Sequence, residues 1–117
     1  MDEKTKPLIV NIELYECSES KISSKEHIQE YVLQLCKMLE INRLTDIRIE
    51  DDGGVGYIMY QPTENAYISA YFMPSTKCAN ITIFSLKPFE DRSIAIFSYD
   101  FFVAGKMDLN FLQRRMV

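Results

Sequence analysis

The residues of this chain that are best suited to bind a ligand are aromatic and gather in its middle third. Tyr57, Tyr60, Tyr67, Tyr71 and Phe72 fall on segments that we expect to be neighbouring strands, so some of them point to the same side and form an aromatic wall. Such a wall attracts cations, and its tyrosine hydroxyls need water or a hydrogen-bond partner. The alternative is that these rings only pack across strands beneath the helices.

Two groups of acidic residues flank the aromatic segments. Glu64 and Asn65 lie where the chain enters the most aromatic segment, and they could contact a ligand there. The acidic residues 50–52 could bind Mg²⁺ or Ca²⁺ through their oxygen atoms. However, carboxylates that precede a Gly–Gly reversal are most often solvated turn residues, so we expect no metal site there.

Residues that would provide nucleophilic or metal chemistry are scarce. The single histidine, His27, falls in the first turn of an expected helix, where a neutral surface residue is the ordinary interpretation. The three cysteines, Cys17, Cys36 and Cys78, have no CxxC spacing, which argues against a zinc site and against a disulfide framework. The glycine-rich residues 53–56 are too short a run to predict a phosphate loop. The sequence therefore predicts neither a metal nor a cofactor.

Length and composition predict one globular domain that spans residues 1–117. The net charge of −4 and the pI near 5.0 argue against a nucleic-acid surface, which needs clustered Lys and Arg. No window reaches the roughly 18 apolar residues of a membrane span, and the acidic start is unlike a secretion signal. We therefore expect a cytoplasmic protein with neither nucleic acid nor membrane as a partner.

Hydrophobic periodicity predicts the elements of the first half of the chain. Residues 8–14 alternate between apolar and other side chains, which is the period of a strand with one buried face. Residues 23–26 form a capping box, in which the Ser23 side chain accepts a hydrogen bond from the backbone N–H of Glu26. Apolar side chains then recur at helical spacing, so we expect a helix that runs to about Glu40.

The second half predicts an antiparallel meander, a helix and a last strand. The expected strands are residues 45–50, 57–61, 67–72, 79–85 and 107–113, the second helix follows Pro88, and Gly105 is the residue just past its end. This order of elements is that of an α+β two-layer sandwich, with two helices on one face of a mostly antiparallel sheet.

Three segments resemble the prokaryotic S-adenosylmethionine decarboxylases. Residues 8–18 are similar to the first strand and turn of that family, and residues 67–74, with the sequence YISAYFMP, resemble its HISIHTWP strand. Residues 81–85 are similar to the strand that follows at the right spacing. The order of elements agrees over nearly the whole chain, so the resemblance implies a decarboxylase-like fold.

The departures from the family pattern concern its chemistry. The family cleaves itself before a serine that becomes a pyruvoyl group, and this position corresponds to Ala66, or to Asn65 if the turn shifts. The processing histidine corresponds to Tyr71 and the catalytic cysteine to Leu86. Neither Ala66 nor Asn65 can form a pyruvoyl group, so we do not expect decarboxylation through a Schiff base.

A related family, the phage-type S-adenosylmethionine lyases, is similar in fold and needs no nucleophile from the protein. In these lyases, often trimers with the site between subunits, the substrate carboxylate displaces the thioether and gives methylthioadenosine and homoserine lactone. The enzyme chiefly holds the ligand in a near-attack geometry. The resemblance implies a cofactor-independent lyase of S-adenosylmethionine or, as in CRISPR-associated relatives of antiviral defence, of its AMP conjugate.

Position and chemical type predict which residues would form such a site. They are Glu64 to hold the α-ammonium, Tyr60 or Tyr71 to orient the reacting groups, and Gln61, Ser69, Phe72 and Met73 to contact the substrate. The expected partners are a small adenosyl ligand and further copies of the chain, with a trimer implied by the resemblance. Two alternatives stay open: a non-catalytic homologue that binds S-adenosylmethionine and regulates an active partner, and a structural module whose aromatic rings only pack.

Overall fold

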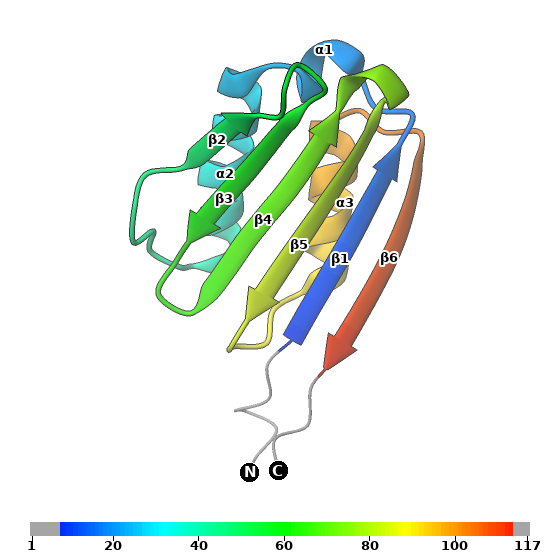
Figure 1. Cartoon of the computed structure of the whole chain (residues 1–117). Coiled ribbons are helices and arrows are strands. Elements are labelled where there is room, and N and C mark those ends of the chain that lie inside the picture. The colour runs from blue at the N-terminus through cyan, green and yellow to red at the C-terminus, as the bar shows by residue number, and fades with distance from the viewer. Residues whose placement is uncertain (1–7, 114–117) are drawn as a thin grey trace.

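A computed structural model describes residues 8–113 and shows a sheet with helices on one of its faces (Figure 1). The elements are β1 (Leu8–Tyr15), α1 (Glu19–Ile22), α2 (Lys25–Leu39), β2 (Arg48–Asp51), β3 (Tyr57–Pro62), β4 (Ala66–Met73), the 3-10 turn η2 (Pro74–Thr76), β5 (Cys78–Ser85), α3 (Asp91–Phe101) and β6 (Lys106–Gln113). Within this range the six-stranded sheet has the order β2-β3-β4-β5-β1-β6, and all neighbours are antiparallel. The predicted α+β architecture is confirmed.

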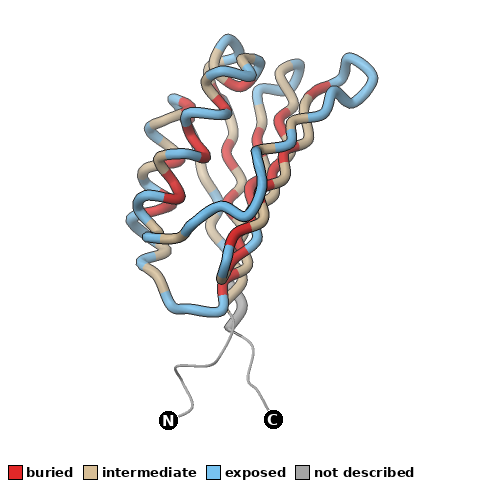
Figure 2. The backbone as a smooth tube through the Cα atoms, turned by 90° about the vertical axis from the view of Figure 1, so that its left-hand side faces the viewer, coloured by how far each residue is buried: buried red, intermediate tan, exposed pale blue. Residues whose placement is uncertain are grey.

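The helices and the sheet form two layers. Figure 2 shows the helical layer on one side of the sheet, with the buried residues between the two layers. In Figure 1 the helices lie behind the sheet, so the viewer looks onto the other face, which no described helix covers. We call this uncovered side the open face. The structure adds one element to the predicted pair of helices, the single turn α1, whose buried residue is Ile22.

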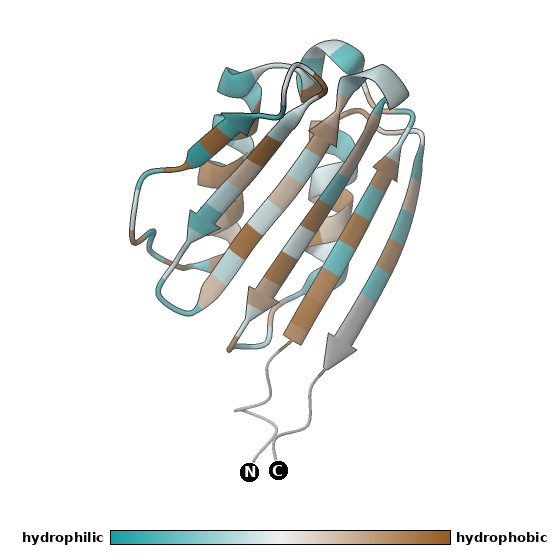
Figure 3. Ribbon diagram, in the orientation of Figure 1, coloured by the Kyte–Doolittle hydropathy of each residue, from teal (hydrophilic) through white to brown (hydrophobic). Residues whose placement is uncertain are grey.

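The alternation predicted for residues 8–14 is confirmed. Val10, Ile12 and Leu14 are fully buried against the helices, whereas Asn11 and Glu13 lie on the open face and are half-buried. Figure 3 shows this alternation of apolar and polar residues along β1. Because successive strand residues point to opposite faces, β1 contributes to the core with one set of side chains and to the open face with the other.

Helix α2 begins one residue later than the capping box predicts. The N-cap is Ser24, whose side chain accepts a hydrogen bond from the backbone N–H of His27 at 3.1 Å. Ser23 is instead the C-cap of α1, so the prediction that it caps α2 is wrong. The helix ends as expected at Glu40, which takes a left-handed conformation with φ of 56°.

Two predictions at the junction of the helices need correction. His27 is half-buried, with its ring stacked 4.2 Å from that of Phe101 and Nε2 at 2.8 Å from the Phe101 carbonyl oxygen, so it is not a free surface residue. The left-handed residue past α3 is Val103, with φ of 52°, and not Gly105. The helix ends at Phe101, so its left-handed residue comes two positions before the expected glycine, and this glycine instead gives room to the Glu16 side chain.

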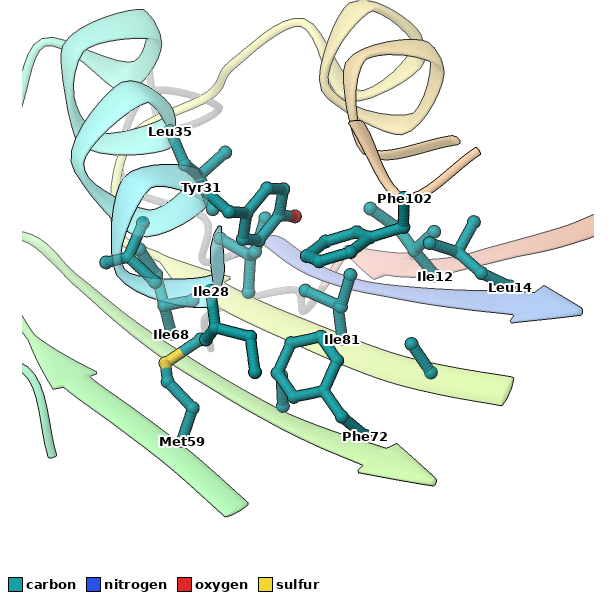
Figure 4. Packing of buried hydrophobic residues seen from close by; sticks show 14 of the residues in the cluster. Ile12, Leu14, Ile28, Tyr31, Leu35, Met59, Ile68, Phe72, Ile81 and Phe102 are labelled. Atoms are coloured by element: carbon teal, nitrogen blue, oxygen red, sulfur yellow. The ribbon is translucent and has the colours of Figure 1, made fainter. Parts of the chain in front are cut away.

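The core is centred on three aromatic side chains from different elements (Figure 4). Tyr31 of α2, Phe72 of β4 and Phe102 at the end of α3 are fully buried, and the Phe102 ring lies 4.8 Å from that of Tyr31 and 5.3 Å from that of Phe72. The buried Tyr31 hydroxyl lies 2.6 Å from Ser98 Oγ, which itself donates to the Ile94 carbonyl. Tyr31 is therefore the donor of the first bond, and its polar atom is satisfied inside the core.

Burial makes Tyr31 a source of pH-dependent stability. It raises the pKa of the phenol well above its ordinary value, an effect that the Ser98 hydrogen bond only partly offsets. The raised pKa means that this contribution is complete below about pH 10, the ordinary pKa of tyrosine, and is lost as the pH rises further. Relative to Tyr31→Phe, the wild-type free energy of unfolding should therefore fall by up to about 1.4 kcal/mol per pH unit above pH 10.

Urea unfolding at pH 8 to 11 measures this effect. At pH 8 Tyr31→Phe should be less stable by about 1 kcal/mol, because a buried hydrogen bond is lost. Tyr67→Phe, which removes an exposed hydroxyl, is the matched control. Parallel pH profiles for the wild type and Tyr31→Phe would contradict the prediction.

Candidate functional site

The open face places side chains of the three central strands in rows. Strand register pairs Tyr60 with Ser69 and Ser69 with Thr82, and in the next row it pairs Tyr71 with both Ile58 and Asn80. The two rows are neighbours, because residues two apart on a strand point the same way. Two tyrosines and several small polar groups thus meet at the middle of the open face.

These side chains line a concavity of about 440 Å³. Its lining residues are Asp52, Ile58, Tyr60, Ser69, Ala70, Tyr71, Asn80 and Thr82. The volume is within the range of roughly 300–1,000 Å³ that is usual for small-molecule sites. Aromatic rings and aliphatic groups form its walls, and hydroxyl, amide and carboxylate groups point into it from several strands.

The turn between β2 and β3 brings Asp52 to this concavity. Gly53 and Gly54 have φ of 62° and 84°, which confirms the positive φ predicted for the glycine pair. Asp51 Oδ1 accepts from the Gly54 N–H at 2.7 Å, and the Asp52 N–H donates to the Gly56 carbonyl at 2.8 Å. The turn is solvent-exposed over residues 51–55, as predicted, and its own hydrogen bonds close it.

Gly56 seats this turn against β4. A Cβ atom at this position would lie 2.0 Å from the Phe72 carbonyl oxygen, far closer than any side chain tolerates. Only glycine lets the backbone of β3 begin so close to the end of β4. This close approach places Asp52 beside Tyr71.

A short hydrogen bond joins the turn to the sheet. The Tyr71 hydroxyl donates to Asp52 Oδ2 at 2.6 Å. This hydrogen bond to a carboxylate raises the pKa of Tyr71, and both desolvation and the nearby Asp52 charge act in the same direction. Tyr71 therefore keeps its proton and acts as a hydrogen-bond donor at the edge of the concavity.

A second network fixes the polar groups on the opposite side. Asn11 Nδ2 donates to Asn80 Oδ1 at 2.8 Å and to Thr82 Oγ1 at 2.9 Å, while Asn80 Nδ2 donates to Glu13 Oε2 at 3.1 Å. The other oxygen of Glu13 accepts from the Tyr15 hydroxyl at 3.0 Å. Asn80 and Thr82 are therefore held in fixed orientations toward the concavity, with Glu13 behind them.

The concavity carries negative charge. Asp52 lines it, Glu13 lies one hydrogen bond behind it, and none of the eight lining residues is Lys or Arg. A cationic ligand suits such a site, since both the carboxylates and the aromatic faces attract positive charge.

The structure separates the predicted site residues into two groups. Tyr60, Tyr71 and Ser69 line the concavity, and Met73 lies on the same face of β4 without lining it. Gln61 and Phe72 instead face the helices and are fully buried, which corrects the expectation that they share one site with the tyrosines. The amide of Gln61 donates to the carbonyls of Thr45 and Pro62, and Phe72 packs on Phe102. Their positions are those of core residues.

The remaining predicted residues also lie elsewhere. Glu64 is exposed in the β3–β4 turn, where its carboxylate accepts from Asn42 Nδ2 at 3.1 Å, and it does not line the concavity. Tyr57 faces the helical side, with Lys25 Nζ 5.5 Å from the centre of its ring. The predicted aromatic wall is therefore divided between the two faces of the sheet.

Five lining residues are not among the predicted ligand contacts, and three of these, Asp52, Asn80 and Thr82, are polar. Asn80 and Thr82 carry a signal in the alternation of the strand at residues 79–85, which would have placed them opposite the apolar Ile81. For Asp52 the sequence indicates only a turn residue or a metal ligand. Among residues 8–113, His, Cys, Asp and Glu nowhere gather in threes that could hold a metal ion.

The positions matched to the family's pyruvoyl serine and to its catalytic cysteine meet at one end of the sheet. Ala66 pairs with Ser85, and the Leu86 N–H donates to the Asn65 carbonyl at 2.9 Å. These two positions are therefore neighbours in space, whereas Tyr71, matched to the processing histidine, lies further along β4 and pairs with Asn80. The residues that occupy them, alanine and leucine, offer no nucleophile.

Comparison with known proteins identifies the class of this chain. Its fold is similar to the crystal structure of the adenosylmethionine decarboxylase from Aquifex aeolicus, with a TM-score of 0.76 over 97% of this chain and 94% of that chain, at 19% identity. It thus has the S-adenosylmethionine decarboxylase-like fold. The family model of S-adenosylmethionine decarboxylase matches residues 8–115, and the chain belongs to this family. A search of curated proteins gave no match. No helix within residues 8–113 has the length and apolar character needed to cross a membrane.

Proposed function

We propose that this protein is a cofactor-independent lyase that cleaves S-adenosylmethionine to methylthioadenosine and homoserine lactone. One observation carries the proposal: a chain of the decarboxylase family has a negatively charged, tyrosine-lined concavity and lacks the serine and cysteine at the matched positions, Ala66 and Leu86. A reaction in which the substrate supplies its own nucleophile fits these residues.

In the proposed reaction all bond changes occur within the ligand. A carboxylate oxygen attacks the γ-carbon, the bond between this carbon and the sulfonium breaks, and its electron pair stays on sulfur. The new O–C bond closes a five-membered lactone. Since the negative and positive charges cancel as the reaction proceeds, a site that solvates them less well than water favours the transition state over the ground state.

The protein's part is to fold the ligand into a near-attack geometry. Tyr60 and Tyr71 lie in adjacent rows of the concavity and can orient the reacting groups from two strands. Tyr71 is already fixed by its bond to Asp52, so Tyr60 is the tyrosine free to turn toward the ligand's carboxylate or ribose. Ser69 and Thr82 add hydroxyl groups along the same row.

A second copy of the chain could exclude water from the concavity by covering the open face. The concavity lies on the open face, which no described helix covers, and the exposed apolar side chains of Tyr67 and Leu86 lie on β4 and just past β5. Exposed apolar surface beside a site favours association. We therefore expect a homo-oligomer, with the trimer as the preferred state.

Charge favours the free substrate over its AMP conjugate. A phosphate group needs nearby Lys or Arg, and the lining residues include neither. Lys77, Lys87 and Arg92, which the sequence offers near these strands, are not among the lining residues. S-adenosylmethionine, whose sulfonium and ammonium give it a net positive charge at neutral pH, suits this concavity better.

The test is incubation of the purified chain with S-adenosylmethionine, and separately with its AMP conjugate, in the presence of a chelator. Mass spectrometry should detect methylthioadenosine and homoserine lactone in equal amounts, at a rate above that of a protein-free sample. Tyr60→Phe should lower this rate by about 10- to 100-fold, because a ligand that Tyr60 no longer orients reaches the near-attack geometry less often.

Intact ligand after long incubation with stoichiometric protein would refute the lyase. If the ligand nonetheless raised the melting temperature, the chain would be a non-catalytic binding homologue, because the same concavity can hold a ligand without turnover. Faster cleavage of the AMP conjugate than of the free substrate would overturn the argument from charge.

A further inference from the structure

We propose that the Asp52 carboxylate binds the α-ammonium group of the adenosyl ligand, and that Tyr71 is the positioning residue that aims it. The inference rests on the proposed function for the class of ligand, an adenosyl compound with an amino-acid tail. It replaces Glu64, the carboxylate expected from the sequence. Three features of the structure lead to it.

The first feature is the rigid position of Asp52. Its backbone N–H donates to the Gly56 carbonyl at 2.8 Å, and its own carbonyl accepts from the Val55 N–H at 2.9 Å. Both hydrogen bonds close the turn around the residue, and Gly56 fixes the turn against β4. A charge held on such a turn needs little reorganisation to meet a ligand.

The second feature is that only one of the two Asp52 carboxylate oxygens is occupied. Oδ2 accepts the Tyr71 hydroxyl at 2.6 Å, which fixes the plane of the carboxylate, and within residues 8–113 Oδ1 accepts no hydrogen bond. Because the pKa of Tyr71 is raised by this same contact, Tyr71 stays a donor and does not add a second negative charge. Oδ1 is thus available to an ammonium group.

The third feature is that the other candidate carboxylates are either fully engaged or away from the concavity. Glu13 uses one oxygen for Tyr15 and the other for Asn80, and Glu64 accepts from Asn42 at the opposite end of β3. With no Lys or Arg among the residues that line the concavity, the charge of Asp52 has no cationic partner there. An ammonium ion of the ligand would supply that partner, as a charge-assisted hydrogen bond.

Binding of two unreactive ligands tests the inference independently of turnover. S-adenosylhomocysteine keeps the α-ammonium and cannot react by sulfonium displacement, whereas methylthioadenosine shares the adenosine and thioether but has no amino-acid tail. Asp52→Asn, which keeps the shape of the side chain, should weaken the binding of S-adenosylhomocysteine by about 10- to 100-fold, as expected for a lost charge-assisted hydrogen bond. It should change the Kd of methylthioadenosine by less than about twofold.

Two further variants complete the experiment. Like Asp52→Asn, Tyr71→Phe should lower the ratio of the affinity for S-adenosylhomocysteine to that for methylthioadenosine. The effect should be smaller, because the carboxylate remains and only its orientation is lost. Glu50→Gln removes a charge of β2 that pairs with Arg48 and does not line the concavity, so it should leave the ratio of the two affinities unchanged.

The outcomes separate the two proposals. Absence of lyase activity with a tail-selective loss in Asp52→Asn would refute the lyase and retain the ammonium site. Equal weakening of both ligands by Asp52→Asn, an equal effect of Glu50→Gln, or no binding of either ligand to the wild type would overturn the assignment of Asp52.

Discussion

Phe102→Ala is expected to lower the free energy of unfolding by about 3–5 kcal/mol, which is a large part of the roughly 5–15 kcal/mol available to a domain of this size. Phe102 is fully buried at the end of α3 and packs on Tyr31 of α2 and Phe72 of β4 (Figure 4). It therefore joins both long helices to the sheet. Its removal leaves a cavity that three separate elements would have to collapse to fill.

Chemical denaturation of the wild type and the variant measures this loss. Ile96→Ala is the control on the same helix, because Ile96 is 58% exposed and its truncation should change stability by no more than about 0.5 kcal/mol. A loss below about 1 kcal/mol for Phe102→Ala would show that the two layers do not depend on this contact.

Gly56→Ala is expected to impair ligand binding and any turnover strongly, while it lowers the free energy of unfolding only moderately. The new methyl group would overlap the Phe72 carbonyl oxygen, so the start of β3 must move away from the end of β4. We expect a cost of about 1–3 kcal/mol in unfolding free energy, as for other overpacked sites. The larger effect is on the site, because Asp52 moves with the turn and a misplacement of about 1 Å can cost roughly 100-fold in rate.

Two measurements are needed for this variant. Unfolding in urea gives the loss of stability, and the affinity for S-adenosylhomocysteine reports the position of Asp52 whether or not the chain is a lyase. Val55→Ala, at an exposed position of the same turn, should alter neither quantity appreciably. Wild-type affinity in Gly56→Ala would mean that the close contact with Phe72 does not position the site.

The fold was largely predictable because its signals are local. The alternation of residues 8–14, the apolar spacing of α2 and the glycine pair at 53–54 each report a backbone geometry that neighbouring residues decide. The other predicted strands and the last helix follow from the same periods, although the strand expected from residue 45 begins only at Arg48. The errors of one residue at Ser23 and of two residues at Gly105 concern helix caps. At these positions nearby residues can each end the helix, and tertiary packing decides which of them does.

Part of the site was also within reach of the sequence. Tyr71 and Phe72 are adjacent, as are Tyr60 and Gln61, so the strand period alone places the members of each pair on opposite faces. Applied strictly, it would have assigned Phe72 and Gln61 to the core and kept Tyr60 and Tyr71 for a ligand. The predicted site therefore contains two residues, Gln61 and Phe72, that the alternation assigns to the core.

What the sequence by itself determined is the aromatic segment at residues 67–74 and its place in an α+β sandwich of the decarboxylase family. Only the tertiary structure decided which carboxylate meets its tyrosine. Asp52 and Tyr71 are 19 residues apart, and Glu64 is closer to Tyr71 in the chain. The choice depends on the register of β3 with β4 and on the close approach at Gly56, which are non-local contacts that no local period encodes.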